Sequence, residues 1–167
     1  MIPKQCCWIL DANVIIDFHE CGLLEVLFNI PDVEIYSPDV ILADLYSVAS
    51  SELTLLGLKK CNLSGDNVLY VEKIASCSPS ISPNDIFALV CAETNKAVLI
   101  TRDEDLKKLA DKLRVKHITT LDIFLILIKL GMITKKEALD AIAILENGER
   151  SFSRNDKNAF SLAIKKL

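Results

Sequence analysis

The sequence has no hydrophobic run long enough to span a membrane. Hydrophobic residues make up 51% of its 167 residues, and the mean hydropathy of +0.33 is high for a soluble protein. The longest apolar runs, such as residues 123–128, nevertheless fall well short of the ~20 residues that a spanning helix needs. The N-terminus, with a single lysine before Asp11, is a poor match to an export signal. We therefore expect a cytoplasmic protein without membrane contact.

The sequence also lacks the patterns of several catalytic and metal-binding classes. Its six cysteines, at positions 6, 7, 21, 61, 77 and 91, show no C-x-x-C spacing, which argues against structural zinc and a disulfide framework. We expect most of them to be small hydrophobic residues of the core. Neither of the two histidines lies near a motif nucleophile, and the five glycines form no phosphate-binding loop.

The charge balance is acidic. The net charge is −4 and the pI is near 5.2. This argues against the broad basic surface of a non-specific nucleic-acid binder. If several of the 23 acids gather around cations, however, the overall sign says little about the rest of the surface. A local basic groove is compatible with this composition.

Strand-like and helix-like segments alternate along the chain, which predicts an α/β fold with a mainly parallel sheet. Apolar or β-branched runs predict strands at residues 8–10, 32–36, 67–74, 97–101 and 115–119. Helical patterns cover two short helices within residues 14–28, a helix capped by Ser37 that carries residues 40–48, and helices at 83–95, 106–113 and 121–130. Residues 53–65 are predicted to be a weak helix or a loop.

Three further helix starts carry a capping signal. Ser82 precedes Pro83 at the first helical position and Asp85 at the third. Thr134 and Glu137 form a capping box before residues 135–145, and residues 153–156 start a final helix. We predict a domain of residues 1–131 and a C-terminal helical extension of residues 132–167, packed on or next to that domain because it contains apolar residues.

Four aspartates occupy distinct places relative to the predicted strands and helices. Asp11 follows the first strand, Asp44 lies on the helix after the second, Asp85 lies in a first helical turn, and Asp103 follows a later strand. Ligands of parallel sheets bind at the carboxyl ends of strands, and Mg²⁺ or Mn²⁺ prefers clustered oxygen ligands. Helix capping is the simpler interpretation of Asp11 and Asp85, and also of Asp105 before a helix from residue 106.

The sequence around these acids resembles a known family. Residues 11–13, 38–45, 82–85 and 99–106 are similar, in order, to the successive blocks of a PIN domain over about residues 5–130. The resemblance implies a Rossmann-like three-layer α/β/α sandwich. It also implies a site in which acids hold one or two Mg²⁺ or Mn²⁺ ions and RNA is cleaved, as in VapC-like toxins and related ribonucleases.

The resemblance also implies roles for individual residues. Catalytic, metal-binding acids are expected at Asp11, Asp44, Asp85 and Asp103, a further metal ligand at Asp105, and loop or substrate support at Asn13, Thr101 and Arg102. Lys107 could contact an RNA phosphate together with Arg102, although a solvated helix face explains both equally well. The departure is at Asp44, where the family more often has glutamate. Aspartate is shorter by one methylene, roughly 1.5 Å, and so reaches a metal through water.

Two functions from different classes follow. The first is a Mg²⁺- or Mn²⁺-dependent endoribonuclease, with an RNA substrate and, as a toxin, a small antitoxin partner. The alternative is a PIN-fold protein with little or no nuclease activity that binds nucleic acid or protein. Asp44, the acidic pI and the C-terminal helices favour this alternative. Apolar C-terminal helices also suggest a homodimer. A receiver-like domain is disfavoured, because residues 67–71 lead to Glu72 and Lys73 instead of an acceptor aspartate.

Overall fold

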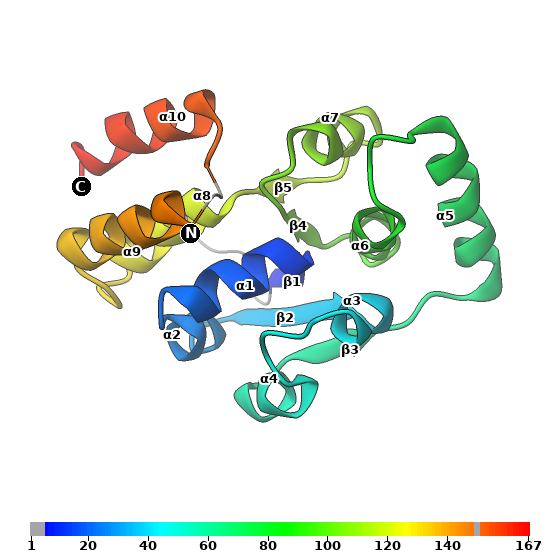
Figure 1. Cartoon of the computed structure of the whole chain (residues 1–167), viewed down its shortest axis with the longest axis horizontal. Coiled ribbons are helices and arrows are strands. Elements are labelled where there is room, and N and C mark those ends of the chain that lie inside the picture. Colours follow the sequence, from blue (N-terminus) through cyan, green and yellow to red (C-terminus); the bar gives the residue numbers. More distant parts are fainter. Residues whose placement is uncertain (1–5, 149–150) are drawn as a thin grey trace.

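A computed structural model of the chain describes residues 6–148 and 151–167. The predicted start of the domain at residue 1 lies outside the described residues. The described part contains a five-stranded, all-parallel sheet in the order β3-β2-β1-β4-β5 (Figure 1). The strands are β1 (Cys6–Leu10), β2 (Val33–Pro38), β3 (Lys59–Cys61), β4 (Val98–Ile100) and β5 (His117–Ile118). The predicted α/β class with a parallel sheet is confirmed.

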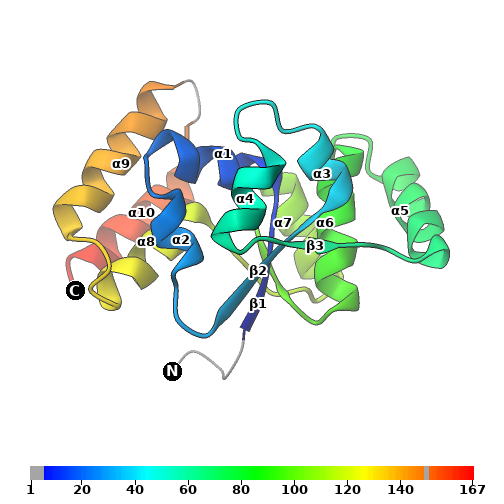
Figure 2. The ribbon, with the colours of Figure 1, turned by 90° about the horizontal axis from the view of Figure 1, so that it is seen from below.

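Helices cover both faces of this sheet, which makes three layers (Figure 2). Their bounds are α1 (Ala12–Glu20), α2 (Leu24–Phe28), α3 (Asp39–Ala43), α4 (Ser50–Leu56), α5 (Gly65–Cys77), α6 (Pro83–Thr94), α7 (Glu104–Lys112), α8 (Thr120–Lys129), α9 (Lys135–Asn147) and α10 (Arg154–Ile164). Side chains of the central strand alternate between the layers, because successive strand residues point to opposite faces. Trp8 and Leu10 join the core that contains α1, α2 and α8, whereas Ile9 joins the core of α5, α6 and α7.

The predicted strand at residues 67–74 is wrong. These residues belong to α5, and the third strand is β3 at Lys59–Cys61. The Ser64 hydroxyl accepts a hydrogen bond from the Asn67 amide at 3.4 Å and caps the helix. The β-branched residues at 68, 71 and 74 are spaced by three, so that Val71 and Ile74 lie buried on one side of a helix. Helical spacing therefore outweighs β propensity in this segment.

The predicted helix over residues 40–48 is much shorter in the structure. α3 ends at Ala43, and Asp44 is the residue that follows the helix. Ser37 does not cap it, because Ser37 lies in β2 and its buried hydroxyl donates a hydrogen bond to the Leu10 carbonyl at 3.1 Å. The bond joins the ends of β1 and β2, and it uses the group that the sequence assigned to the helix cap.

The C-terminal helices pack on the layer that contains α1 and α8 (Figure 1). Leu145, Phe152 and Phe160 are buried in the same core cluster as Trp8 and Leu10. The capping box predicted for α9 is present. Burial of these apolar side chains accounts for the docking of residues 132–148 and 151–167, the described parts of the extension, on the sheet-bearing core.

Two expectations about burial can be compared with the structure. Only Cys61 and Cys91 are buried, whereas three other cysteines are half-buried and Cys77 is exposed, so the prediction that most lie in the core is wrong. Cys6 and Cys7 begin the central strand β1, Cys21 follows α1, and Cys77 is the last residue of α5. Within residues 6–148 and 151–167, no helix is both long enough and apolar enough to cross a membrane.

Candidate functional site

The candidate site lies at the carboxyl ends of β1 and β4, which are neighbours in the sheet. From β1 the chain continues outward to β2, and from β4 it continues in the other direction to β5. Such a point of reversal leaves a crevice between the two strand ends, where ligands of open parallel sheets bind. Asp11 follows β1, and its amide donates a hydrogen bond to the Ile100 carbonyl of β4 at 3.2 Å. Asp103 follows β4 after Thr101 and Arg102.

Asp11 is wholly buried at the start of α1. It is the N-cap of that helix, and its Oδ1 accepts a hydrogen bond from the Val14 amide at 2.9 Å. Its other carboxylate oxygen, Oδ2, is buried and has no hydrogen-bond partner in the described part of the chain. A buried oxygen left in this state costs free energy. Capping therefore explains one oxygen of Asp11 and leaves the other unexplained.

The surroundings of the Asp11 side chain disfavour its ionised, carboxylate form. Burial raises the pKa of Asp11 to about 7, although the Thr101 hydroxyl and the Val14 amide act in the opposite direction. The negative charges of Asp85 and Asp17 raise the pKa further. The carboxyl group thus lies among like charges, with Asp85 near enough to affect its ionisation.

Asp85 is the third residue of α6 and lies behind the Ser82 cap. The Ser82 hydroxyl donates to Oδ2 of Asp85 at 2.6 Å and accepts from the Asp85 amide at 3.2 Å. Burial raises the pKa of Asp85, the bond from Ser82 lowers it, and the negative charge of Asp103 raises it again. Asp11, Asp85 and Asp103 are therefore linked electrostatically, each to the next.

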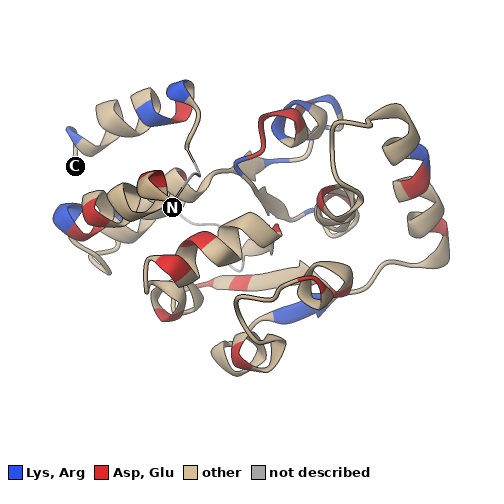
Figure 3. Ribbon diagram, viewed as in Figure 1, with Lys and Arg blue, Asp and Glu red and all other residues tan. Residues whose placement is uncertain are grey.

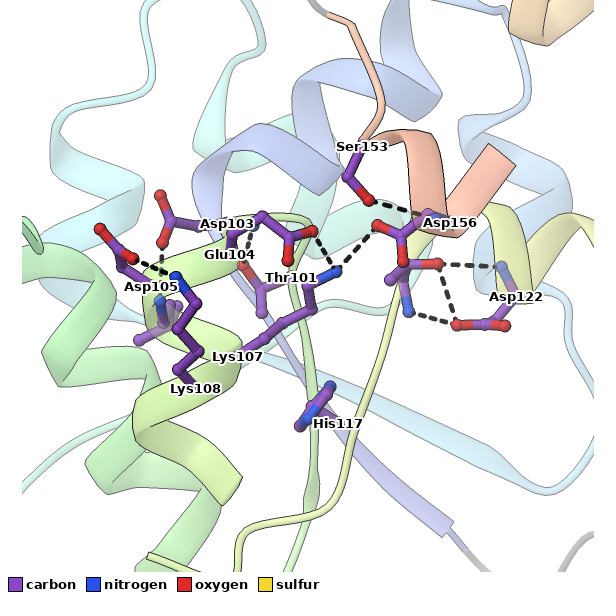
Figure 4. Close-up of polar contacts among 12 residues, drawn as sticks. Thr101, Asp103, Glu104, Asp105, Lys107, Lys108, His117, Asp122, Ser153 and Asp156 are labelled. Atoms are coloured by element: carbon purple, nitrogen blue, oxygen red, sulfur yellow. Dashed lines mark hydrogen bonds and ion pairs between the residues drawn. The ribbon is translucent and has the colours of Figure 1, made fainter. Parts of the chain in front are cut away.

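Asp103 begins α7. Its Oδ1 accepts a hydrogen bond from the Leu106 amide at 2.7 Å, and its own amide donates to the Thr101 hydroxyl at 3.1 Å (Figure 4). The buried Thr101 side chain thus holds the loop between β4 and α7. The helix begins at Glu104, so the predicted cap at Asp105 is wrong: Asp103 is the cap.

Asp105 lies on the exposed side of α7. Its Oδ1 accepts a hydrogen bond from Lys108 Nζ at 3.0 Å, and this contact lowers the pKa of Asp105 (Figure 4). The neighbouring ammonium group thus offsets its charge, unlike that of Asp11. We expect Asp105 to contribute less to a cation site than the other three acids.

Asp44 is exposed and is the residue that follows α3. Its Oδ2 accepts a hydrogen bond from Asn84 Nδ2 at 2.7 Å. Asn84 immediately precedes Asp85, so this bond places Asp44 beside the start of α6. The sequence reasoning missed Asn84 as a partner, although the residue lies within the 82–85 block that pointed to the family.

The cationic residues near the acids make contacts with this chain itself. The Arg102 guanidinium lies 3.6 Å from Asp17 Oδ2 and 5.5 Å above the Phe152 ring. The Thr120 hydroxyl donates to the same Asp17 oxygen at 3.1 Å. Arg102 therefore joins the strand-end loop to α1 and to the C-terminal segment. The sequence reasoning missed Asp17, whose position on α1 carries no motif.

Lys107 is largely buried and makes two ion pairs. Its Nζ lies 2.6 Å from Glu104 Oε1 and 2.8 Å from Asp156 Oδ2, at the start of α10 (Figure 4). A predicted contact between Lys107 and an RNA phosphate would have to compete with both carboxylates. Asn13 is half-buried in the first turn of α1, and its supporting role stays a prediction.

The acids fit a hard divalent cation in donor type and in charge. Acidic residues occur at the starts of α1, α6 and α7, around one edge of the sheet (Figure 3). Within the residues that the structure describes, no three His, Cys, Asp or Glu side chains are close enough together to hold a metal ion. Mg²⁺ commonly uses one or two carboxylates and keeps several waters. Asp11 Oδ2 offers one such ligand, and Asp85 is close enough to affect its ionisation.

Most of the chain matches a known protein family. Residues 7–160 match the family model DUF3368, which is described as a PIN domain. No curated protein sequence matches the chain. Two solved structures are similar over 68% of this chain and 98% of their own: VapBC2 from Rickettsia felis bound to a promoter DNA fragment, with 16% identity and a TM-score of 0.47, and VapBC-1 from nontypeable Haemophilus influenzae, with 19% and 0.48.

Proposed function

The chain belongs to the PIN-domain family, whose members are generally nucleases, and on this premise we propose that it is a Mg²⁺- or Mn²⁺-dependent endoribonuclease. One observation supports the metal dependence most strongly. Asp11 is wholly buried, its Oδ2 has no hydrogen-bond partner in the described residues, and its pKa is raised to about 7 beside Asp85. A divalent cation at this position would offset the clustered negative charge.

In this proposal each residue of the chain has a separate task. Asp11 Oδ2 would bind the cation or one of its waters, and Asp85 and Asp103 would bind it directly or through water. The Thr101 hydroxyl and the Ser82 hydroxyl keep Asp103 and Asp85 in place. A bound Mg²⁺ or Mn²⁺ would supply an activated water and stabilise the charge on the phosphate oxygens.

The test compares the wild type with Asp85→Asn in two assays, Mn²⁺ binding and cleavage of single-stranded RNA. We expect weaker Mn²⁺ binding and about 100-fold slower cleavage for the variant, because metal-based charge stabilisation supplies several kcal/mol. Equal behaviour of the two proteins, or no metal binding by either, would contradict the proposal.

Glu137→Gln is the matched control for this experiment. Glu137 is also the third residue of its helix, and it accepts a hydrogen bond from its cap, the Thr134 hydroxyl, at 2.7 Å. It lies in α9, away from the acids at the sheet edge. The control removes the same charge from the same helical position, so it separates loss of a cap from loss of a metal ligand.

A second candidate function is a PIN-fold module that binds nucleic acid or protein with little or no nuclease activity. The contact between Asp44 and Asn84 favours it, because the Asp44 carboxylate already accepts a hydrogen bond from the Asn84 side-chain amide. The absence of a three-ligand cluster among the described side chains favours it as well. RNA binding without cleavage at saturating Mn²⁺ would support this second function over the first.

A role as a toxin is a finer part of the proposal. It adds an RNA target in the cytoplasm and a small antitoxin that binds the chain and blocks cleavage. Homodimer formation is a further prediction. Expression of this chain with the protein encoded beside its gene, followed by co-purification and an RNA-cleavage assay, tests the antitoxin and the RNA substrate. Loss of cleavage in the complex supports the toxin, whereas unchanged cleavage contradicts it.

A further inference from the structure

Two buried cysteines outside the acid site lie unusually close together. Cys61 is the last residue of β3, and Cys91 lies in the middle of α6, 30 positions further along the chain. Their Sγ atoms are 2.6 Å apart. A disulfide has an S–S length of ~2.04 Å, so bond formation closes the gap by about 0.6 Å. No other pair of the six cysteines has such a contact among the described residues.

We propose that Cys61 and Cys91 form a reversible intramolecular disulfide when the protein meets a peroxide. The disulfide would join the edge strand β3 to α6. This modification site is independent of the proposed nuclease function, and it uses neither the acids nor a metal.

The surroundings of the two thiols assign them different roles. The side-chain amide nitrogen of Asn95, Nδ2, donates hydrogen bonds to Cys61 Sγ at 3.5 Å and to the Cys91 carbonyl at 2.8 Å. The contact with Cys91 lowers the pKa of Cys61 most, Asn95 lowers it further, and burial opposes both. The contact with Cys61 and burial raise the pKa of Cys91. Because Asn95 donates to Cys61 Sγ and Cys61 lines the cavity described next, we assign Cys61 as the attacking thiolate and Cys91 as the thiol that resolves the intermediate.

A small oxidant has a route to Cys61. A cavity of about 220 Å³ is lined by Cys61, Asn95, Lys60, Tyr36 and other residues of β1 and the β3 end. A water molecule occupies about 30 Å³ of liquid volume, so hydrogen peroxide fits easily. Cys91 itself is wholly buried and does not line this cavity. Attack at Cys61 followed by internal resolution is thus consistent with the geometry.

The chemistry balances with peroxide as the two-electron oxidant. The Cys61 thiolate attacks one peroxide oxygen, the O–O bond breaks, and Cys61 becomes a sulfenic acid while hydroxide leaves. The Cys91 sulfur then attacks the sulfenic sulfur, the S–O bond breaks, and the disulfide forms. The hydroxide and the sulfenic oxygen leave as two waters, which take up the two thiol protons. An added dithiol restores both thiols.

The experiment treats the full wild-type chain with hydrogen peroxide, blocks the remaining thiols after unfolding, and maps the peptides by mass spectrometry. We expect a loss of about 2 Da, four blockable thiols in place of six, and one cross-linked peptide pair that contains Cys61 and Cys91. We also expect the oxidised chain to melt about 5 °C or more above the reduced chain, because the bond closes a long loop of the unfolded state.

Two variants sharpen the result. Cys91→Ala should abolish the cross-link and the rise in melting temperature, whereas Cys77→Ala, at an exposed position, should leave both unchanged. If Cys91→Ala does not fold, the peptide map of the wild type decides alone. Absence of the Cys61–Cys91 peptide under conditions that oxidise Cys77, or an unchanged rise in melting temperature on oxidation of Cys91→Ala, overturns the proposal.

Discussion

Two regions of the candidate site, the end of β1 and the end of α3, differ in how neighbouring groups offset the negative charge of their carboxylates. On the β1 side, Asp11 is wholly buried, one of its oxygens lacks a hydrogen-bond partner in the described residues, and its neighbours carry like charge. On the α3 side, Asp44 is exposed and accepts a hydrogen bond from Asn84. Uncompensated charge is therefore concentrated on the β1 side. A bound cation would therefore interact more favourably with the Asp11 carboxylate than with the Asp44 carboxylate.

The largest expected effect is the pH dependence of stability caused by Asp11. Its pKa is raised from 3.8 to about 7, so the folded state binds a proton more tightly than the unfolded state between these values. The free energy of unfolding should therefore be highest in acid and should fall as pH rises towards 7, by up to about 4 kcal/mol. Urea unfolding at several pH values, without divalent cations, measures this fall.

Asp11→Asn should remove this part of the pH dependence. Asparagine also caps helices well and carries no charge to bury. Other titrating groups contribute the same slope to both proteins, so the difference between the two curves isolates Asp11. If the two curves of unfolding free energy against pH are parallel from pH 4 to 8, Asp11 does not have a pKa raised by burial and neighbouring negative charges.

The contacts that Arg102 makes with Asp17 and Phe152 should also be important for stability. Arg102→Ala removes the cation beside Asp17, which is wholly buried, and breaks the contact with the Phe152 ring. Loss of one partner of a buried ion pair costs about 3 kcal/mol or more. Lys60→Ala is the control, because the pair of Lys60 and Asp39 is about half exposed and should contribute at most about 1 kcal/mol. Equal destabilisation by the two variants in chemical unfolding contradicts a supporting role for Arg102.

Cation binding should stabilise the fold in a pH-dependent manner. At 100 times its Kd, Mn²⁺ adds about 2.7 kcal/mol, which for a chain of this size corresponds to a rise of about 5–10 °C in Tm. Because protons compete for Asp11 below pH 7, the rise should be clear at pH 8 and much smaller at pH 5.5. Thermal melts at both pH values test this. The same rise at pH 5.5 would mean that Mn²⁺ binds elsewhere.

The smallest effect is expected at Asp44. Asp44→Asn removes the charge but keeps an oxygen that can accept the Asn84 hydrogen bond. The rate of RNA cleavage should fall by less than about fivefold, compared with about 100-fold for Asp85→Asn. Initial rates at saturating Mn²⁺ give the ratio, and equal losses at the two positions would remove the distinction between the two sides.

Much of the fold was predictable because its signals are local. The Ser82 cap, the capping box at Thr134 and the apolar strands beside Asp11 and Asp103 needed no tertiary information. α5 was mistaken for a strand, since its β-branched residues mask a helical spacing that only packing resolves. The cap predicted at Ser37 is wrong because the Ser37 hydroxyl makes a tertiary hydrogen bond to the Leu10 carbonyl, which no local pattern reveals.

The placement of the candidate acids could be predicted only in part. The order of the acids along the chain indicated a shared edge, and the sheet order brings Asp11 and Asp103 to neighbouring strand ends. The partners of Asp44 and Arg102 could not be predicted. Asn84 and Asp17 come from other elements, and their contacts depend on how α6 and α1 lie against the sheet.

A Mn²⁺ titration of three proteins, the wild type, Asp11→Asn and Asp44→Asn, tests the central claim most directly. Free Mn²⁺ can be followed at pH 8 by electron paramagnetic resonance. We predict that the wild type and Asp44→Asn bind the ion with similar affinity and that Asp11→Asn loses at least tenfold in affinity. Binding by Asp11→Asn that matches the wild type would contradict the account.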